Sequence, residues 1–175
     1  MSKSIFSHLL SLTFLVLALI GTTNSVKAQY KTAIGLRLGS PLSISLKHFL
    51  REPLALEVYV GTRGYTSSLR TANVSAALQF HKPLELIDEL DGLHYYLGVG
   101  ASAFFWSYGG LFDGINFSDN SIGIQGYAGL DYAFASTPIN LSLDWSPTIF
   151  LNTDYVRGFG LGYGSLSIRY IFKSK

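Results

Sequence analysis

Charged side chains recur at alternate positions in stretches of the chain that are otherwise apolar. Alternate positions share one face of a β-strand, so these charges are expected to project to the same side. Basic and acidic types occur in similar numbers, which suits ion pairing or an ion-conducting path. The candidates are Arg37, Lys47, Glu57, Arg63, Asp131, Asp144 and Arg169, with His81 and His94 nearer one end. We favour an ion-paired polar core over conduction, because a buried ion without a partner costs several kcal/mol.

Eight alternating stretches predict the strands that position these charges. Turn residues separate several of them, as in GSP after Gly39, REP at Arg51–Pro53 and STP at Ser136–Pro138. The expected strands are Tyr30–Gly39, Leu42–Leu50, Leu54–Gly64, Thr71–His81, Leu93–Trp106, Ser121–Phe134, Ile139–Leu151 and Gly158–Phe172. No linker or low-complexity segment interrupts the series, which indicates one all-β domain.

The stretch INLSLDW, residues 139–145, shows why the apolar face must be assigned. In a soluble sandwich or a lipocalin-like binder the apolar face points inward, whereas in a membrane barrel it points into lipid. Loop lengths favour the barrel, because longer loops alternate with short turns along the chain. Aromatic residues expected near strand ends favour it too, as rings at the two membrane interfaces. These are Tyr30, Tyr65, Trp106, Tyr132, Trp145 and Tyr170.

The N-terminal segment 1–28 has the features of a cleavable secretory signal. Lys3 precedes an apolar run from Leu9 to Ile20, and the small-residue pattern ends at Ala28. The expected mature domain is therefore residues 29–175. The signal holds two of the thirteen basic residues and no acid, so its removal lowers the formal net charge from +2 to 0. We therefore expect no nucleic-acid partner, and the absence of cysteine excludes disulfides.

The signal, the eight alternating strands and the final strand SLSIRYIF together resemble the small eight-stranded bacterial outer-membrane β-barrels, similar to OmpX and the membrane domain of OmpA. The resemblance covers the whole mature chain. It implies an antiparallel up-and-down transmembrane barrel in the outer membrane, in contact with membrane lipid and inserted by the barrel-insertion machinery through the last strand. Two features depart from the family: Phe172 is followed by three further residues, and the inner turn Lys82–Gly92 is long.

Enzymatic and metal-dependent functions find little support in the sequence. A lipid-modifying enzyme of the outer leaflet needs a nucleophile beside a histidine at the outer rim, but the histidines are expected near the inner end. The glycine-rich GFGLGYG has no following helix, as a nucleotide-binding loop requires. We expect no enzyme activity, cofactor or metal, and a structural or surface-binding role through the outer loops; a narrow pore is the alternative. The residues that could form a surface contact patch for an unknown ligand are Tyr108, Leu111, Phe112, Ile115 and Phe117.

The turn Arg51-Glu52-Pro53 also predicts a pairing register. If Leu50 and Leu54 flank the turn, Lys47 lies directly opposite Glu57 on the polar face. Opposite charges on facing positions attract, so we expect the two side chains to form a pair inside the barrel.

Overall fold

The computed structural model describes residues 30–64, 69–84, 92–108, 117–134, 136–151 and 159–173, and its regular structure consists of strands. The third strand has the predicted bounds, and the others agree within a few residues. β4, β5 and β6 are longer than predicted, because pairing continues past the last clearly alternating residue. The strands are β1 (Thr32–Gly39), β2 (Leu42–Arg51), β3 (Leu54–Gly64), β4 (Leu69–Pro83), β5 (Leu93–Tyr108), β6 (Phe117–Ala133), β7 (Ile139–Phe150) and β8 (Phe159–Lys173).

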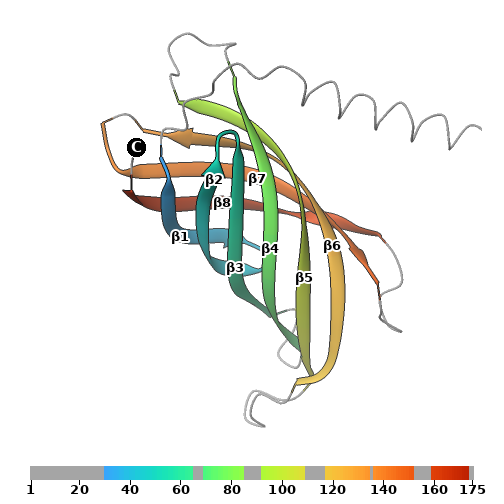
Figure 1. Ribbon diagram of the computed structural model, residues 1–175. Coiled ribbons are helices and arrows are strands. Elements are labelled where there is room, and N and C mark those ends of the chain that lie inside the picture. The colour runs from blue at the N-terminus through green and yellow to red at the C-terminus, as the bar shows by residue number, and fades with distance from the viewer. Residues whose placement is uncertain are drawn as a thin grey trace, which may run out of the picture.

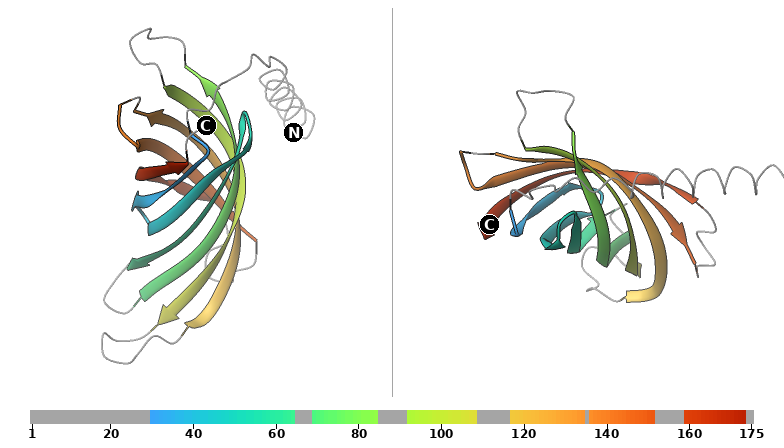
Figure 2. Two further views of the ribbon diagram at one scale, coloured as in Figure 1. Left: turned by 60° about the vertical axis from the view of Figure 1, so that its left-hand side comes forward. Right: turned by 45° about the horizontal axis from the view of Figure 1, so that its top comes forward.

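Each strand pairs antiparallel with its neighbours in sequence, and β8 returns to pair with β1. The sheet is therefore a closed barrel, which confirms the predicted eight-stranded architecture (Figure 1). Closure leaves no strand edge open to pair with another chain. The strands are strongly tilted, and the wall formed by β4 to β6 reaches well beyond β1 and β2 at the end opposite the termini (Figures 1 and 2). No helix among the described residues is long and apolar enough to cross a membrane.

The two faces of the barrel have opposite polarity. Leu143 leaves 57% of its surface exposed on the outside, whereas its neighbour Ser142 is 2% exposed and points inward. The same alternation holds along β2, where Ile44 and Leu46 are exposed and Ser45 and Lys47 are buried. The predicted assignment of faces is confirmed, and a soluble sandwich with an apolar interior is excluded.

Two aromatic residues do not lie where the sequence predicted an interfacial ring. Tyr30 is 2% exposed and packs inside the barrel, edge-on to Phe49 with ring centroids 5.1 Å apart. Trp145 is 49% exposed on the outer face, as expected, but it lies in the middle of β7. Both predictions of an interfacial position were wrong. A residue at the start of a closed barrel can turn into the barrel mouth. The predicted bounds Ile139–Leu151 already placed Trp145 near the centre of its strand, so assigning it to a strand end was inconsistent with them.

Several sequence predictions fall partly or wholly outside the described residues. These are the signal segment, Tyr65, most of the turn Lys82–Gly92, and Leu111, Phe112 and Ile115 of the outer patch. Of that turn, Lys82 and Pro83 belong to β4. Of that patch, Tyr108 ends β5 and Phe117 begins β6.

Candidate functional site: a buried ionic network

Among the described residues, six buried charged side chains form a cluster in the interior, each from a different one of six strands. Three are cations and three are anions, so the cluster is formally neutral. All six are almost fully buried. They are Arg37 on β1, Lys47 on β2, Glu57 on β3, Asp131 on β6, Asp144 on β7 and Arg169 on β8.

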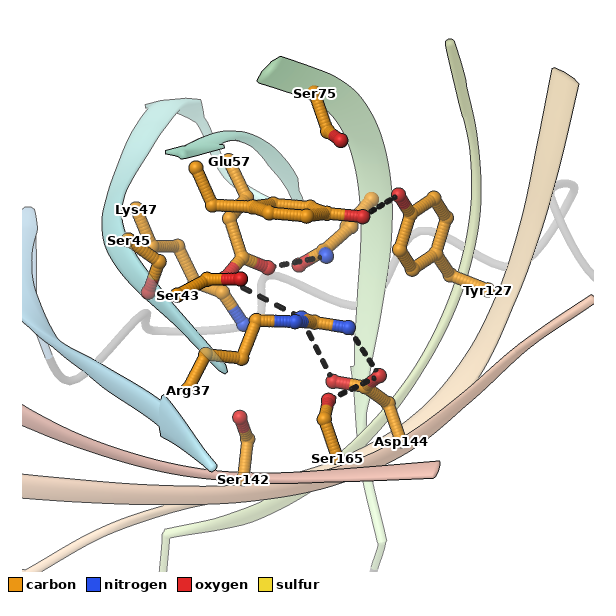
Figure 3. Close-up of polar contacts among 12 residues, drawn as sticks. Arg37, Ser43, Ser45, Lys47, Glu57, Ser75, Tyr127, Ser142, Asp144 and Ser165 are labelled. Carbon is orange, nitrogen blue, oxygen red and sulfur yellow. Dashed lines mark hydrogen bonds and ion pairs between the residues drawn. The ribbon is translucent and has the colours of Figure 1, made fainter. Parts of the chain in front are cut away.

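The link between Arg37 and Asp144 joins β1 to β7, past the intervening strand β8. Two guanidinium nitrogens of Arg37 donate to the two carboxylate oxygens of Asp144, at 3.0 and 2.6 Å (Figure 3). Tyr96 and Ser165 also donate to this carboxylate, each at 2.8 Å. A bidentate arginine–carboxylate pair fixes both partners in orientation as well as in distance. Gly129 makes room for this arrangement, since a Cβ there would lie 2.7 Å from both Asp144 and Tyr96.

Glu57 is the second carboxylate, and its partners differ from those predicted. It accepts from Nη2 of Arg169, and Nη1 of Arg37 lies 3.6 Å from the same oxygen. Its other oxygen accepts from the amide of Gln79 at 2.6 Å. Arg169 also donates through Nε to Ser45 at 2.9 Å, and through Nη1 to Ser142 at 2.7 Å and Asn140 at 3.3 Å. Glu57 thus links β1, β4 and β8 across the lumen.

The register prediction for Lys47 was correct, but the predicted ion pair was wrong. Lys47 and Glu57 are paired positions of β2 and β3. The ammonium of Lys47 instead reaches Asp131, at 2.9 Å, and lies 4.5 Å from the ring centroid of Tyr96. A long lysine side chain can cross the lumen, so the nearest backbone position does not determine its partner.

Asp131 completes the network at the end of the barrel that carries the termini. Besides Lys47, it accepts from Asn140 at 2.8 Å and from the hydroxyl of Tyr30 at 3.2 Å. Sequence reasoning missed Tyr30 as a member, because it placed this residue in an interfacial aromatic ring at the start of the first strand. Arg63, the seventh predicted member, is half-buried farther along β3 and does not take part in these ion pairs.

The histidines near this end do not form a catalytic arrangement. His81 is 1% exposed and stacks on Tyr96 with ring centroids 4.8 Å apart, and neither ring nitrogen has a hydrogen-bond partner. His94 is half-buried, with Nδ1 3.1 Å from the carbonyl oxygen of Gly92. His48 contacts the hydroxyl of Thr32 at 2.8 Å, on the strand face away from the lumen. A nucleophile–histidine pair requires a third group that orients the histidine. In the part of the chain that the structure describes, no carboxylate orients the ring of His48.

Metal binding finds no site within the described residues, where no three His, Asp or Glu side chains are grouped to hold an ion. The carboxylates of the network are instead occupied by arginine, lysine, amide and hydroxyl donors. What the arrangement can do is neutralise the lumen and hold the strands in register.

Comparison with known proteins identifies the architecture. No protein-family model matches the sequence, and no curated protein matches it. Among solved structures, the barrel is similar to the N-terminal β-barrel domain of Pseudomonas aeruginosa OprF. That match has a TM-score of 0.59 and 14% identity, and it covers 83% of this chain and 98% of the other. The chain has the fold of a small outer-membrane barrel. Neisserial surface protein A is similar too, with a TM-score of 0.58, 19% identity and coverage of 81% and 93%.

Proposed function

We propose that this protein is an integral β-barrel of the bacterial outer membrane with a structural, non-enzymatic role. The observation that carries the proposal is the polarity of the closed barrel: large apolar side chains cover the outside, and charged side chains fill the inside. A continuous apolar exterior of this extent is unfavourable in water. In lipid it is the surface that a barrel needs, and closure satisfies every strand edge.

The ionic network supports a structural role. It draws one ion from each of six strands, and Gln79 and Tyr96 extend it to β4 and β5. All eight strands are therefore connected through the lumen. Such a barrel is a rigid membrane anchor, and its outer loops are the segments available for a surface ligand. The patch that includes Tyr108 and Phe117 is the surface that we assign to such a contact.

Export and insertion follow from the same proposal. The segment 1–28 directs secretion and is removed. β8 is the strand that the insertion machinery recognises, and its Phe172 leaves 56% of its surface exposed on the outer face.

Membrane residence is tested by cell fractionation combined with heat-modifiable mobility on gels. We expect the protein in the outer-membrane fraction, resistant to extraction with alkaline carbonate. We also expect the unheated barrel to migrate differently from the boiled chain. Recovery in the soluble periplasmic fraction would rule out the proposal.

A second experiment separates the structural role from a pore. An eight-stranded barrel has a lumen just wide enough for its own side chains, and here the lumen contains Tyr59, Tyr96 and Phe104 beside the ion pairs. We expect no steady current when the purified barrel is inserted in planar lipid bilayers. Reproducible open states of porin size would replace the structural role with transport.

A further inference from the structure

A groove on the outer face of the barrel crosses five neighbouring strands. Its volume is about 530 Å³, within the range of about 300–1,000 Å³ for small-molecule sites. Its lining is almost entirely apolar. It includes Leu54 on β3, Phe80 on β4, Leu97 on β5, Ala128 on β6, and Trp145 and Pro147 on β7.

The groove follows from the register of the strands. One row of paired outward positions runs from Leu54 through Phe80 and Leu97 to Ala128 and Trp145. The next row runs from Leu78 through Val99 to Gly126. Rows of outward side chains lie two residues apart, about 7 Å along a strand. That spacing is wide enough for one hydrocarbon chain.

Small residues and a proline deepen the groove over β6. Gly126 and Ala128 present little side chain, while Trp145 is exposed beside them. Pro147 has no N–H to donate, and the pairing of β6 with β7 is interrupted between Gln125–Thr148 and Ala128–Trp145. A Cβ added at Gly126 would meet Pro147 at 3.5 Å, an ordinary contact. A side chain would therefore fit here, and the hollow is not forced by backbone crowding.

One end of the groove opens beside two basic residues. Leu54 is paired with Arg51, which is exposed at the end of the barrel that carries the termini. Lys82 lies two residues beyond Phe80, with its ammonium 5.9 Å from the ring centroid. The groove covers four strand spacings of about 4.8 Å, so it is about 19 Å long. One leaflet of hydrocarbon is about 15 Å thick, so the length of the groove is comparable with that of an acyl chain in one leaflet.

We propose that the groove is a binding site for one anionic phospholipid of the leaflet at the termini end. An acyl chain lies between the two rows and reaches Trp145, and the phosphate is held by Arg51 and Lys82. This inference rests on the proposed membrane residence. It goes beyond general lipid contact because it assigns one chain path and one headgroup charge.

Fluorescence quenching of Trp145 tests the proposal directly. The full chain is purified as the Trp106→Phe variant, which leaves Trp145 as the single tryptophan. It is placed in phosphatidylcholine vesicles that contain a minor fraction of either phosphatidylglycerol or phosphatidylcholine brominated at mid-chain. We expect quenching by the brominated phosphatidylglycerol to correspond to a roughly five- to tenfold local enrichment, because two basic residues attract it.

Variants separate the chain path from the headgroup contact. Gly126→Leu combined with Ala128→Leu fills the groove and is expected to abolish the enrichment. Ala76→Leu, on the outer face but outside the groove, should leave it unchanged. Arg51→Gln with Lys82→Gln should remove the preference for phosphatidylglycerol, and Lys31→Gln, at the same end beside β1, should retain it.

Each outcome has a distinct reading. Equal quenching by both lipids, unaffected by the filling variant, would overturn the phospholipid site while the barrel stays in the membrane. Weak quenching by both lipids, with a dimer that the filling variant dissociates, would assign the groove to a second copy and also overturn it. A chain that does not float with vesicles or show heat-modifiable mobility would instead contradict the proposed function.

Discussion

Replacing Glu57 with glutamine is expected to destabilise the barrel by about 3–5 kcal/mol, the usual cost of leaving a buried ion without its partner. Among the ion pairs of the network, Glu57 is the carboxylate that neutralises Arg169, and it also lies 3.6 Å from Arg37. Arg37 retains Asp144 in the variant, but Arg169 is left with only neutral partners. The measurement is the free energy of unfolding from urea titrations of the barrel in lipid vesicles.

A double variant and a surface control make this prediction specific. Glu57→Gln combined with Arg169→Gln should be less destabilised than Glu57→Gln alone, because it removes the unpaired charge. Glu52→Gln, the same change at the partly exposed turn five residues away, should cost less than about 1 kcal/mol. If the double variant is the less stable of the two, Arg169 is not the ion that Glu57 neutralises.

The strands and their faces were predictable because one physical constraint acts at every position. A strand that separates lipid from a polar lumen must alternate, so Ser142 and Leu143 reveal their sides from sequence alone. The pairing of Lys47 with Glu57 was likewise predicted correctly, although Leu54 pairs with Arg51 and not with Leu50, because the register shifts between Phe49 and Arg51. These features depend on neighbours in sequence or on adjacent strands.

The partners inside the lumen were not predictable in the same way. Lys47 pairs with Asp131 and Arg37 with Asp144, residues 84 and 107 positions apart. Such contacts depend on the curvature and stagger of the closed sheet, which no single strand encodes. The inward orientation of Tyr30 has the same origin, since it requires a cavity mouth formed by other strands.

The groove is a third case. The sequence contains a signal for it, Pro147, but this proline lies within a regular alternating pattern that predicts an ordinary strand. Pro147 interrupts an otherwise regular strand pattern, and proline is unusual in the centre of a sheet. Its consequence appears only with the register, which places the proline beside Gly126 of β6. A residue that weakens a strand and a residue that lacks a side chain together create the hollow.

Replacing Leu143 with arginine is expected to prevent stable assembly in the membrane. Leu143 leaves 57% of its surface exposed on the outer face of β7, and Arg on the lipid face costs about 2–4 kcal/mol near the midplane. Ser142 is not a suitable control, because its hydroxyl accepts from Arg169 at 2.7 Å and an arginine there would disturb the network.

Leu143→Phe is the matched control, since it adds bulk at the same site without charge. We expect the arginine variant to lose most of its heat-modifiable, membrane-inserted form, while the phenylalanine variant assembles normally. Full assembly of Leu143→Arg would mean that this face does not meet lipid.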